Sequence, residues 1–288
     1  MYVASILALA LVCATQTHGF SEKAVFCQTN ALNQATYNFI NFIGFPGAWS
    51  QSNASALWKT YYPLAYFLNQ QVSATPGSIN GFYTVCNGFE QLWGMLLGFG
   101  NQNCLTAENL INGMTVDPGT AFSVVGLLNK YKFICGAGFY TLLRERNIDC
   151  VQRVIANFNT TFALCLATYQ ANVQHDPTSA CRYIGDFTSC NALVFNTSAC
   201  TNGNNVDFWW GCEGSLQFAL AQFPSCRHAR SCTINRSPFG IGGFERELME
   251  YSKTHYKFEN GQHWFKLPDI FKEINGKWVL SENDWVTG

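Results

Sequence analysis

The sequence predicts a mainly α-helical fold, namely a disulfide-stapled helical bundle with a small C-terminal β-hairpin meander. Apolar residues recur at three- and four-residue steps along much of the chain, which is the spacing of a buried helix face. Twelve cysteines, an even set, remain once an N-terminal leader is removed. The last 56 residues lack cysteine and carry two Asn-Gly pairs between aromatic and β-branched residues, which is a strong hairpin signal.

The N-terminal stretch from Tyr2 to Ala14 is apolar and uncharged, which is typical of the hydrophobic region of a secretory signal peptide. It is shorter than the roughly 20 apolar residues that a membrane-spanning helix needs, and no other stretch is long enough. We therefore expect a signal peptide over residues 1–19, cleaved after Ala14 or after Gly19. We also expect a secreted, extracellular product without a transmembrane anchor.

Cleavage of the leader removes Cys13 and makes the cysteine count even, as closed pairing requires. In an oxidising compartment these residues should form disulfides. The sequence lacks paired Cys-x-x-Cys spacings, and only His228 lies between the closest pair as a nitrogen ligand, so we expect no metal site. The predicted disulfide residues are Cys27, Cys86, Cys104, Cys135, Cys150, Cys165, Cys181, Cys190, Cys200, Cys212, Cys226 and Cys232.

Four Asn-x-Ser/Thr sequons agree with export, because glycans are added to such sites in secreted chains. The predicted glycosylation sites are Asn53, Asn159, Asn196 and Asn235.

Charge divides the chain near Cys232. Of the 35 charged residues, 20 lie in the first 232 positions and 15 in the last 56. We therefore expect a cysteine-rich helical domain over residues 20–232 and a charged, aromatic, β-rich tail over residues 233–288. The formal net charge of −1 leaves no broad basic face, so nucleic acid is not an expected partner.

One helical stripe in the body begins at Phe82 and continues through Trp93 to Leu97, where Gly98 and Gly100 would end the helix. Less regular helical patterns run over residues 27–43 and 122–143.

A second stripe, from Val151 to Tyr169, predicts one long helix that carries both Cys150 and Cys165. Fifteen helical residues rise about 22 Å, far more than the ~7 Å that a disulfide spans between Cα atoms. These two cysteines therefore cannot pair with each other, and the rest of the connectivity stays open.

A third stripe runs from Trp209 to Phe223, with Asn204 and Asn205 as capping candidates.

In the tail, Asn260-Gly261 and Asn275-Gly276 predict two successive hairpins, over residues 258–266 and 272–280, that form one meander. So small a sheet buries too little to stand alone, and we expect it to pack on the body or on a partner.

No motif points to a reaction. His175-Asp176 suggests a phospholipase-like pair, but Pro177 follows at once and no glycine-rich calcium loop precedes it, so a solvated turn is the expected structure. His255 and His263 flank the first tail turn and are expected to be surface residues. We expect no catalytic residues, no cofactor and a non-enzymatic protein.

The cysteines from Cys86 to Cys232, together with the stretch Lys130-Tyr131-Lys132-Phe133-Ile134-Cys135-Gly136-Ala137-Gly138-Phe139, resemble the chondroitin proteoglycan 4 domains of nematodes and, more distantly, the T20D4-type cysteine-rich extracellular domains. The resemblance covers about half of the chain. It implies a helical body held by disulfides, an extracellular address and a role in eggshell or matrix. The family carries chondroitin on Ser-Gly sites, and this chain has no Ser-Gly dipeptide.

Two hypotheses follow for the function. The first is a secreted, N-glycosylated protein of extracellular matrix or body fluid that acts in structure or in binding another protein or a glycan. The alternative is an extracellular carrier of lipid or another apolar ligand. The dense aromatic clusters at residues 61–67 and 208–210 could belong to a core or line a cavity, and a large aromatic-lined cavity would favour the carrier.

Overall fold

The computed structural model describes residues 27–144, 146–197, 206–228 and 232, together with five short strands between residues 256 and 287. The fold is mainly helical, as predicted. The helices are α2 (Thr29–Ile43), α3 (Tyr62–Ser73), α4 (Asn80–Gly98), α5 (Ala107–Asn112), α6 (Pro118–Phe133), α7 (Phe139–Arg144), α8 (Ile148–Asn157), α9 (Asn159–His175), α10 (Ala180–Thr197) and α11 (Val206–Ala219). Short helical turns are η1 (Ala54–Lys59), η2 (Gln102–Leu105), η3 (Ile134–Gly138), η4 (Pro177–Ser179) and η5 (Pro224–His228).

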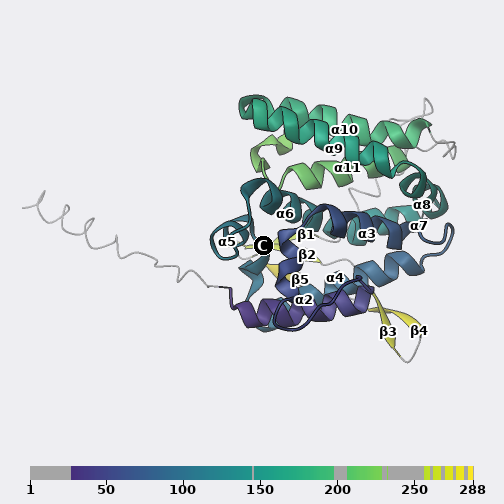
Figure 1. Ribbon diagram of the computed structural model, residues 1–288. Helices are drawn as coiled ribbons and strands as arrows, with labels where there is room; N and C mark the ends of the chain where they lie inside the picture. The colour runs from purple at the N-terminus through teal and green to yellow at the C-terminus, as the bar shows by residue number, and fades with distance from the viewer. Residues whose placement is uncertain are drawn as a thin grey trace, which may run out of the picture.

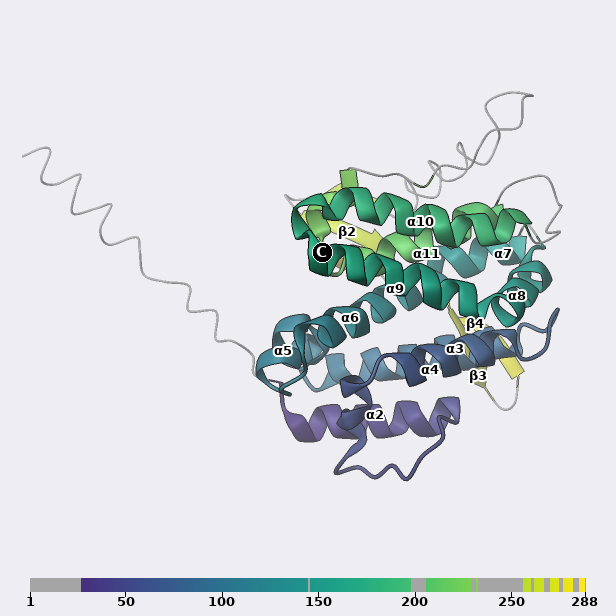
Figure 2. The ribbon, with the colours of Figure 1, turned by 45° about the horizontal axis from the view of Figure 1, so that its top comes forward.

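The helices stack in layers, as Figures 1 and 2 show from two directions. At one side lie α2 and α4, at the other α9, α10 and α11, and between them lie α3 and α6. Within the part of the chain described, no helix is both long and apolar enough to cross a bilayer.

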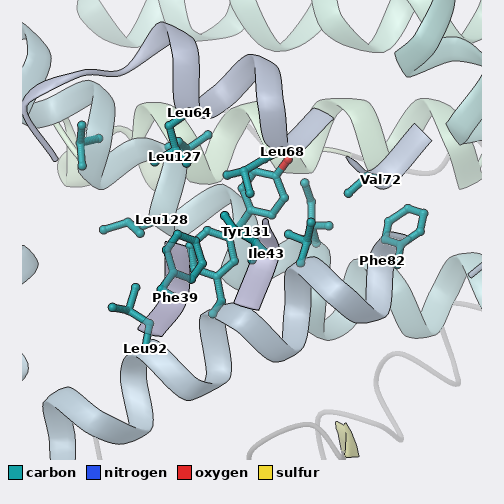
Figure 3. Packing of buried hydrophobic residues seen from close by; sticks show 14 of the residues in the cluster. Phe39, Ile43, Leu64, Leu68, Val72, Phe82, Leu92, Leu127, Leu128 and Tyr131 are labelled. Atoms are coloured by element: carbon teal, nitrogen blue, oxygen red, sulfur yellow. The ribbon is translucent and has the colours of Figure 1, made fainter. Parts of the chain in front are cut away.

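A first hydrophobic core fills the space between α2, α3, α4 and α6, and Figure 3 shows part of it. Phe39 and Tyr131 both pack on Phe89, with ring centroids 5.0 and 5.2 Å from it. The buried indole nitrogen of Trp58 donates a hydrogen bond of 2.7 Å to Oγ1 of Thr36, so this polar atom costs little to bury. Each fully buried side chain of this size contributes about 1.5–3 kcal/mol through removal from water.

A second, smaller core lies between α9, α10 and α11. Its central helix is α11, which is buried nearly all round because α10 covers one side and α6 the other. At the crossing of α6 and α11, a Cβ on Gly126 would lie 2.7 Å from the carbonyl oxygen of Phe218. The absent side chain therefore lets these two helices approach closely. Tyr61 packs against both cores.

Disulfides join the helices at the predicted cysteines. The pairs are Cys27–Cys104, Cys86–Cys135, Cys165–Cys190, Cys181–Cys226 and Cys212–Cys232. Cys150 is also disulfide-bonded, and Cys200 lies outside the described residues. As predicted, Cys150 and Cys165 do not pair with each other, because Cys165 bonds to Cys190 on α10.

The predicted helix that carries Cys150 and Cys165 is in fact two helices. Phe158, at φ −115° and ψ 20°, separates α8 from α9. The two helices pack on different partners, α8 on α3 and α9 on α10, so the break lets each apolar face meet its own neighbour.

The pattern over residues 122–143 is also interrupted. A π-helical segment at Ile134–Gly138 joins α6 to α7, and Gly136 within it has non-helical angles, φ −105° and ψ −115°. The stripe on α4 holds except at its end, where Leu96 is buried but Leu97 is 62% exposed.

The tail contains strands β1 (Tyr256–Glu259), β2 (Gln262–Lys266), β3 (Ile270–Ile274), β4 (Lys277–Ser281) and β5 (Trp285–Thr287). Their backbones pair antiparallel as two sheets, β1-β2-β5 and β3-β4. In a single meander β3 would pair with β2, but in the structure β5 pairs with β2 instead. Both Asn-Gly turns lie outside the described residues, so the predicted hairpins stay a prediction. The leader and the boundary between body and tail also lie outside them.

Candidate functional site

A cavity of about 530 Å³ opens where the two cores meet. Its walls come from the start of α3, the end of α6, the start of α9, and the facing sides of α10 and α11. The lining residues are Tyr61, Tyr62, Pro63, Ala65, Tyr66, Asn69, Leu127, Lys130, Asn159, Thr160, Phe162, Ala163, Leu166, Phe187, Asn191, Ser215 and Phe218.

The interior and the mouth of the cavity differ in how exposed their lining residues are. The inner wall is buried and mostly apolar, with Leu127, Phe187 and Phe218 at 2–6% exposure. The mouth carries two large exposed aromatic side chains, Tyr62 at 55% and Tyr66 at 54%. Apolar interior surface with aromatic residues at the entrance is typical of sites that bind small apolar molecules.

Tyr61 packs against both cores at this point. Its ring lies 5.8 Å from that of Phe218 on α11 and 5.1 Å from that of Tyr62. Burial raises the pKa of its hydroxyl, with a further contribution from Tyr62, so the ring remains neutral. Tyr61 thus contacts α11 and Tyr62 and lines the cavity between the two cores.

Two hydrogen bonds, referred to below as the latch, connect Tyr62 at the mouth of the cavity to Gln170 on α9 and Ser123 on α6. The hydroxyl of Tyr62 donates to Oε1 of Gln170 at 3.1 Å, and Nε2 of Gln170 donates to Oγ of Ser123 at 2.9 Å. Beyond this latch, on the other side of residues 61–63, lies a second cavity of about 710 Å³ with a more polar lining that includes Asp117 and Lys59.

Polar groups line one side of the first cavity. The hydroxyl of Tyr131 donates to Oδ1 of Asn69 at 3.3 Å, and Nδ2 of Asn69 donates to Oδ1 of Asn159 at 3.4 Å. This chain connects α6, α3 and the first residue of α9. It fixes the polar wall, while the opposite wall stays apolar.

Lys130 is the one cationic side chain that the lining contains. It is partly buried, and burial lowers its pKa to about 8. In the described part of the chain, no hydrogen bond or ion pair engages its ammonium group. Lys132, two residues on, lies instead over the ring of Trp93, 4.6 Å from the centroid.

The predicted glycosylation sites fall in different surroundings. Asn53 is exposed and its Oδ1 accepts a hydrogen bond from the backbone of Ser50. Asn159 is partly buried at the cavity. The side chain of Asn196 and all of Asn235 lie outside the described residues.

The His175-Asp176 pair forms a turn between α9 and η4. Asp176 caps the turn by accepting from the backbone and the hydroxyl of Thr178, and side-chain hydrogen bonds from Thr178 and Ser179 hold the pKa of Asp176 at about 2. His175 is exposed. The solvated turn that the sequence favoured is therefore what the structure has. His255 and the side chain of His263 lie outside the described residues.

The sequence did not point to Lys130 as a site residue. The available signal was a lysine at the end of an otherwise apolar stretch of α6, the position where a surface residue is usually expected. Of the two aromatic clusters, Trp209 and Trp210 are buried in the core, whereas the cluster at residues 61–67 is divided between core and cavity.

Comparisons with known protein families, with curated proteins and with solved structures found no match for this chain.

Proposed function

We propose that this chain is a secreted, non-enzymatic carrier that binds one apolar small molecule in the cavity beside Tyr61. What supports the proposal is the cavity itself, an aromatic-lined volume of about 530 Å³ with a buried apolar floor. Ligand sites for small molecules typically measure about 300–1,000 Å³ and are mostly apolar with a few polar groups.

The structural or matrix role that the sequence favoured has less support. Such a role needs surface features only and gives no use to an aromatic-lined cavity with a buried apolar floor. A ligand that fills the cavity would remove this apolar surface from water. For this reason we rank the carrier above the matrix protein, in reverse of the order that the sequence alone favoured.

Secretion, N-glycosylation and the resemblance to nematode chondroitin proteoglycan 4 domains form part of the same proposal. The disulfides are compatible with an oxidising, extracellular address, because such bonds rarely persist in cytosol. In this view the chain shares a helical scaffold with that family, and the cavity is its own ligand site.

Titration of the purified full chain with the uncharged fluorescent probe N-phenyl-naphthylamine tests the proposal. We expect saturable enhancement with one site per chain, displaced by dodecanol. The variant Ala65→Phe, which places a ring inside the lining, should abolish the enhancement. Linear, non-saturating fluorescence, or equal binding by Ala65→Phe, would contradict the carrier and favour a structural role.

A further inference from the structure

Building on the proposed function, we propose that the cavity selects apolar ligands with a carboxylate head group and that Lys130 binds this group. The ligand class is thus a fatty acid or a similar carboxylic amphiphile, with its chain along the apolar floor and its head at the end of α6.

The position of Lys130 is the first observation behind this assignment. It lies in the last turn of α6, and it lines both the main cavity and a narrow extension of about 20 Å³ next to Tyr131 and Asn191. The apolar side chains of Phe162 and Phe187 line the main cavity with it. One cavity therefore offers an apolar wall for a chain and a cation for its head.

The second observation is that the charge has no counterion. Ion pairing in the described residues leaves Lys130 out, whereas the neighbouring Lys132 is engaged by the ring of Trp93. A partly buried ammonium without a partner is costly, because burial removes hydration and nothing replaces it. A ligand carboxylate would supply the missing charge through a charge-assisted hydrogen bond.

The groups around Lys130 determine the pKa of its ammonium group. The ionisable groups that share its cavities are tyrosines, namely Tyr61, Tyr62, Tyr66 and Tyr131. On α11, outside the lining, Glu213 accepts a 2.7 Å hydrogen bond from Gln217, and on α10 Asp186 is exposed. Burial in this environment lowers the pKa of Lys130 to about 8, so the side chain is mostly protonated at neutral pH.

Calorimetric titration with dodecanoate and with dodecanol, two ligands that share a chain and differ in charge, tests the assignment at pH 7. The Lys130→Met variant should lose about ten- to a hundredfold in affinity for dodecanoate, the range expected for one hydrogen bond to a charged group. Its affinity for dodecanol should change less than about threefold. Lys132→Met is the matched control and should bind both ligands as the unaltered chain does.

The pH dependence provides a second readout that does not rely on Lys130→Met folding. A carboxylate binds the protonated lysine, so binding raises the lysine pKa above its free value near 8. Affinity for dodecanoate should therefore be flat from pH 6 to about 8, fall by up to about tenfold per pH unit above that, and level off once about ten- to a hundredfold is lost. Dodecanol should show no such fall. Lys130→Arg, which stays charged, should keep dodecanoate binding with a flat profile to pH 10.

The outcomes separate this inference from the proposed function. If the unaltered chain binds both ligands equally and without pH dependence, the cavity is a carrier site but the carboxylate assignment is wrong. If it binds neither ligand, the carrier itself is wrong. A loss of dodecanoate affinity in Lys132→Met equal to that in Lys130→Met would also overturn the role of Lys130.

Discussion

Two aromatic-rich regions of this molecule are packed in opposite ways. Around Phe39 and Trp58 the rings of α2, α4 and η1 contact one another, and Phe39, Trp58 and Phe89 are at most 4% exposed. Around Tyr61 and Phe218, rings of similar size stand between helices and leave a cavity of about 530 Å³. Aromatic content alone therefore does not distinguish a core from a binding site; what matters is whether the facing helices can close over the rings.

Covalent bonds differ between these regions as well. Three disulfides, Cys165–Cys190, Cys181–Cys226 and Cys212–Cys232, hold the smaller core beside the cavity, at sequence separations of 25, 45 and 20 residues. The first core is larger and has two of the described bridges, Cys27–Cys104 and Cys86–Cys135, at separations of 77 and 49 residues. The smaller core beside the cavity therefore has more of these bridges for fewer buried residues.

The largest effect should come from breaking one disulfide on each side. Cys181→Ser/Cys226→Ser and Cys27→Ser/Cys104→Ser should each lower the free energy of unfolding by about 2–4 kcal/mol, measured by guanidinium denaturation. Only the first pair should also abolish probe binding, because it releases α10 from the segment after α11. Equal loss of binding in both variants would show that the cavity does not depend on the local bridge.

An intermediate effect should come from placing the same ring in each region. Ala35→Phe overfills the first core, where Ala35 is 0% exposed, and should cost about 1–3 kcal/mol. Ala65→Phe enters the cavity and should cost less than about 1 kcal/mol while it blocks the probe. Thermal denaturation measures both variants. A larger loss for Ala65→Phe than for Ala35→Phe would mean that the cavity is not free space.

The smallest effect concerns the predicted glycosylation sites. Thr161→Ala removes the sequon of Asn159 at the cavity, and Ser55→Ala removes that of the exposed Asn53; both asparagines are retained. Each should change stability by less than about 0.5 kcal/mol, as is usual for surface changes. If Asn159 carries the proposed glycan, Thr161→Ala should speed dodecanol exchange a few-fold in stopped-flow fluorescence, because the variant has no sugar chain beside the cavity. Ser55→Ala should leave the rate unchanged, and an equal change in both would show that the Asn159 glycan does not lie at the entrance.

The sequence predicted the helices wherever a single face is buried. The stripe from Phe82 on α4 is an example, since its buried residues follow one period. The sequence-based prediction failed where contacts with distant helices determine the structure. The break at Phe158 is an example, because α8 and α9 pack on different helices and no local sequence pattern records those partners. Lys130 was missed for the same reason, because its exposure depends on α9, α10 and α11, which come later in the chain.

The measurement that tests the central claim most directly is native mass spectrometry of the full-length protein before and after organic extraction. The account predicts a mass excess of one small molecule per chain that extraction removes, and that Ala65→Phe lacks. A native mass equal to that of the extracted protein, together with no uptake of added dodecanoate or dodecanol, would contradict it.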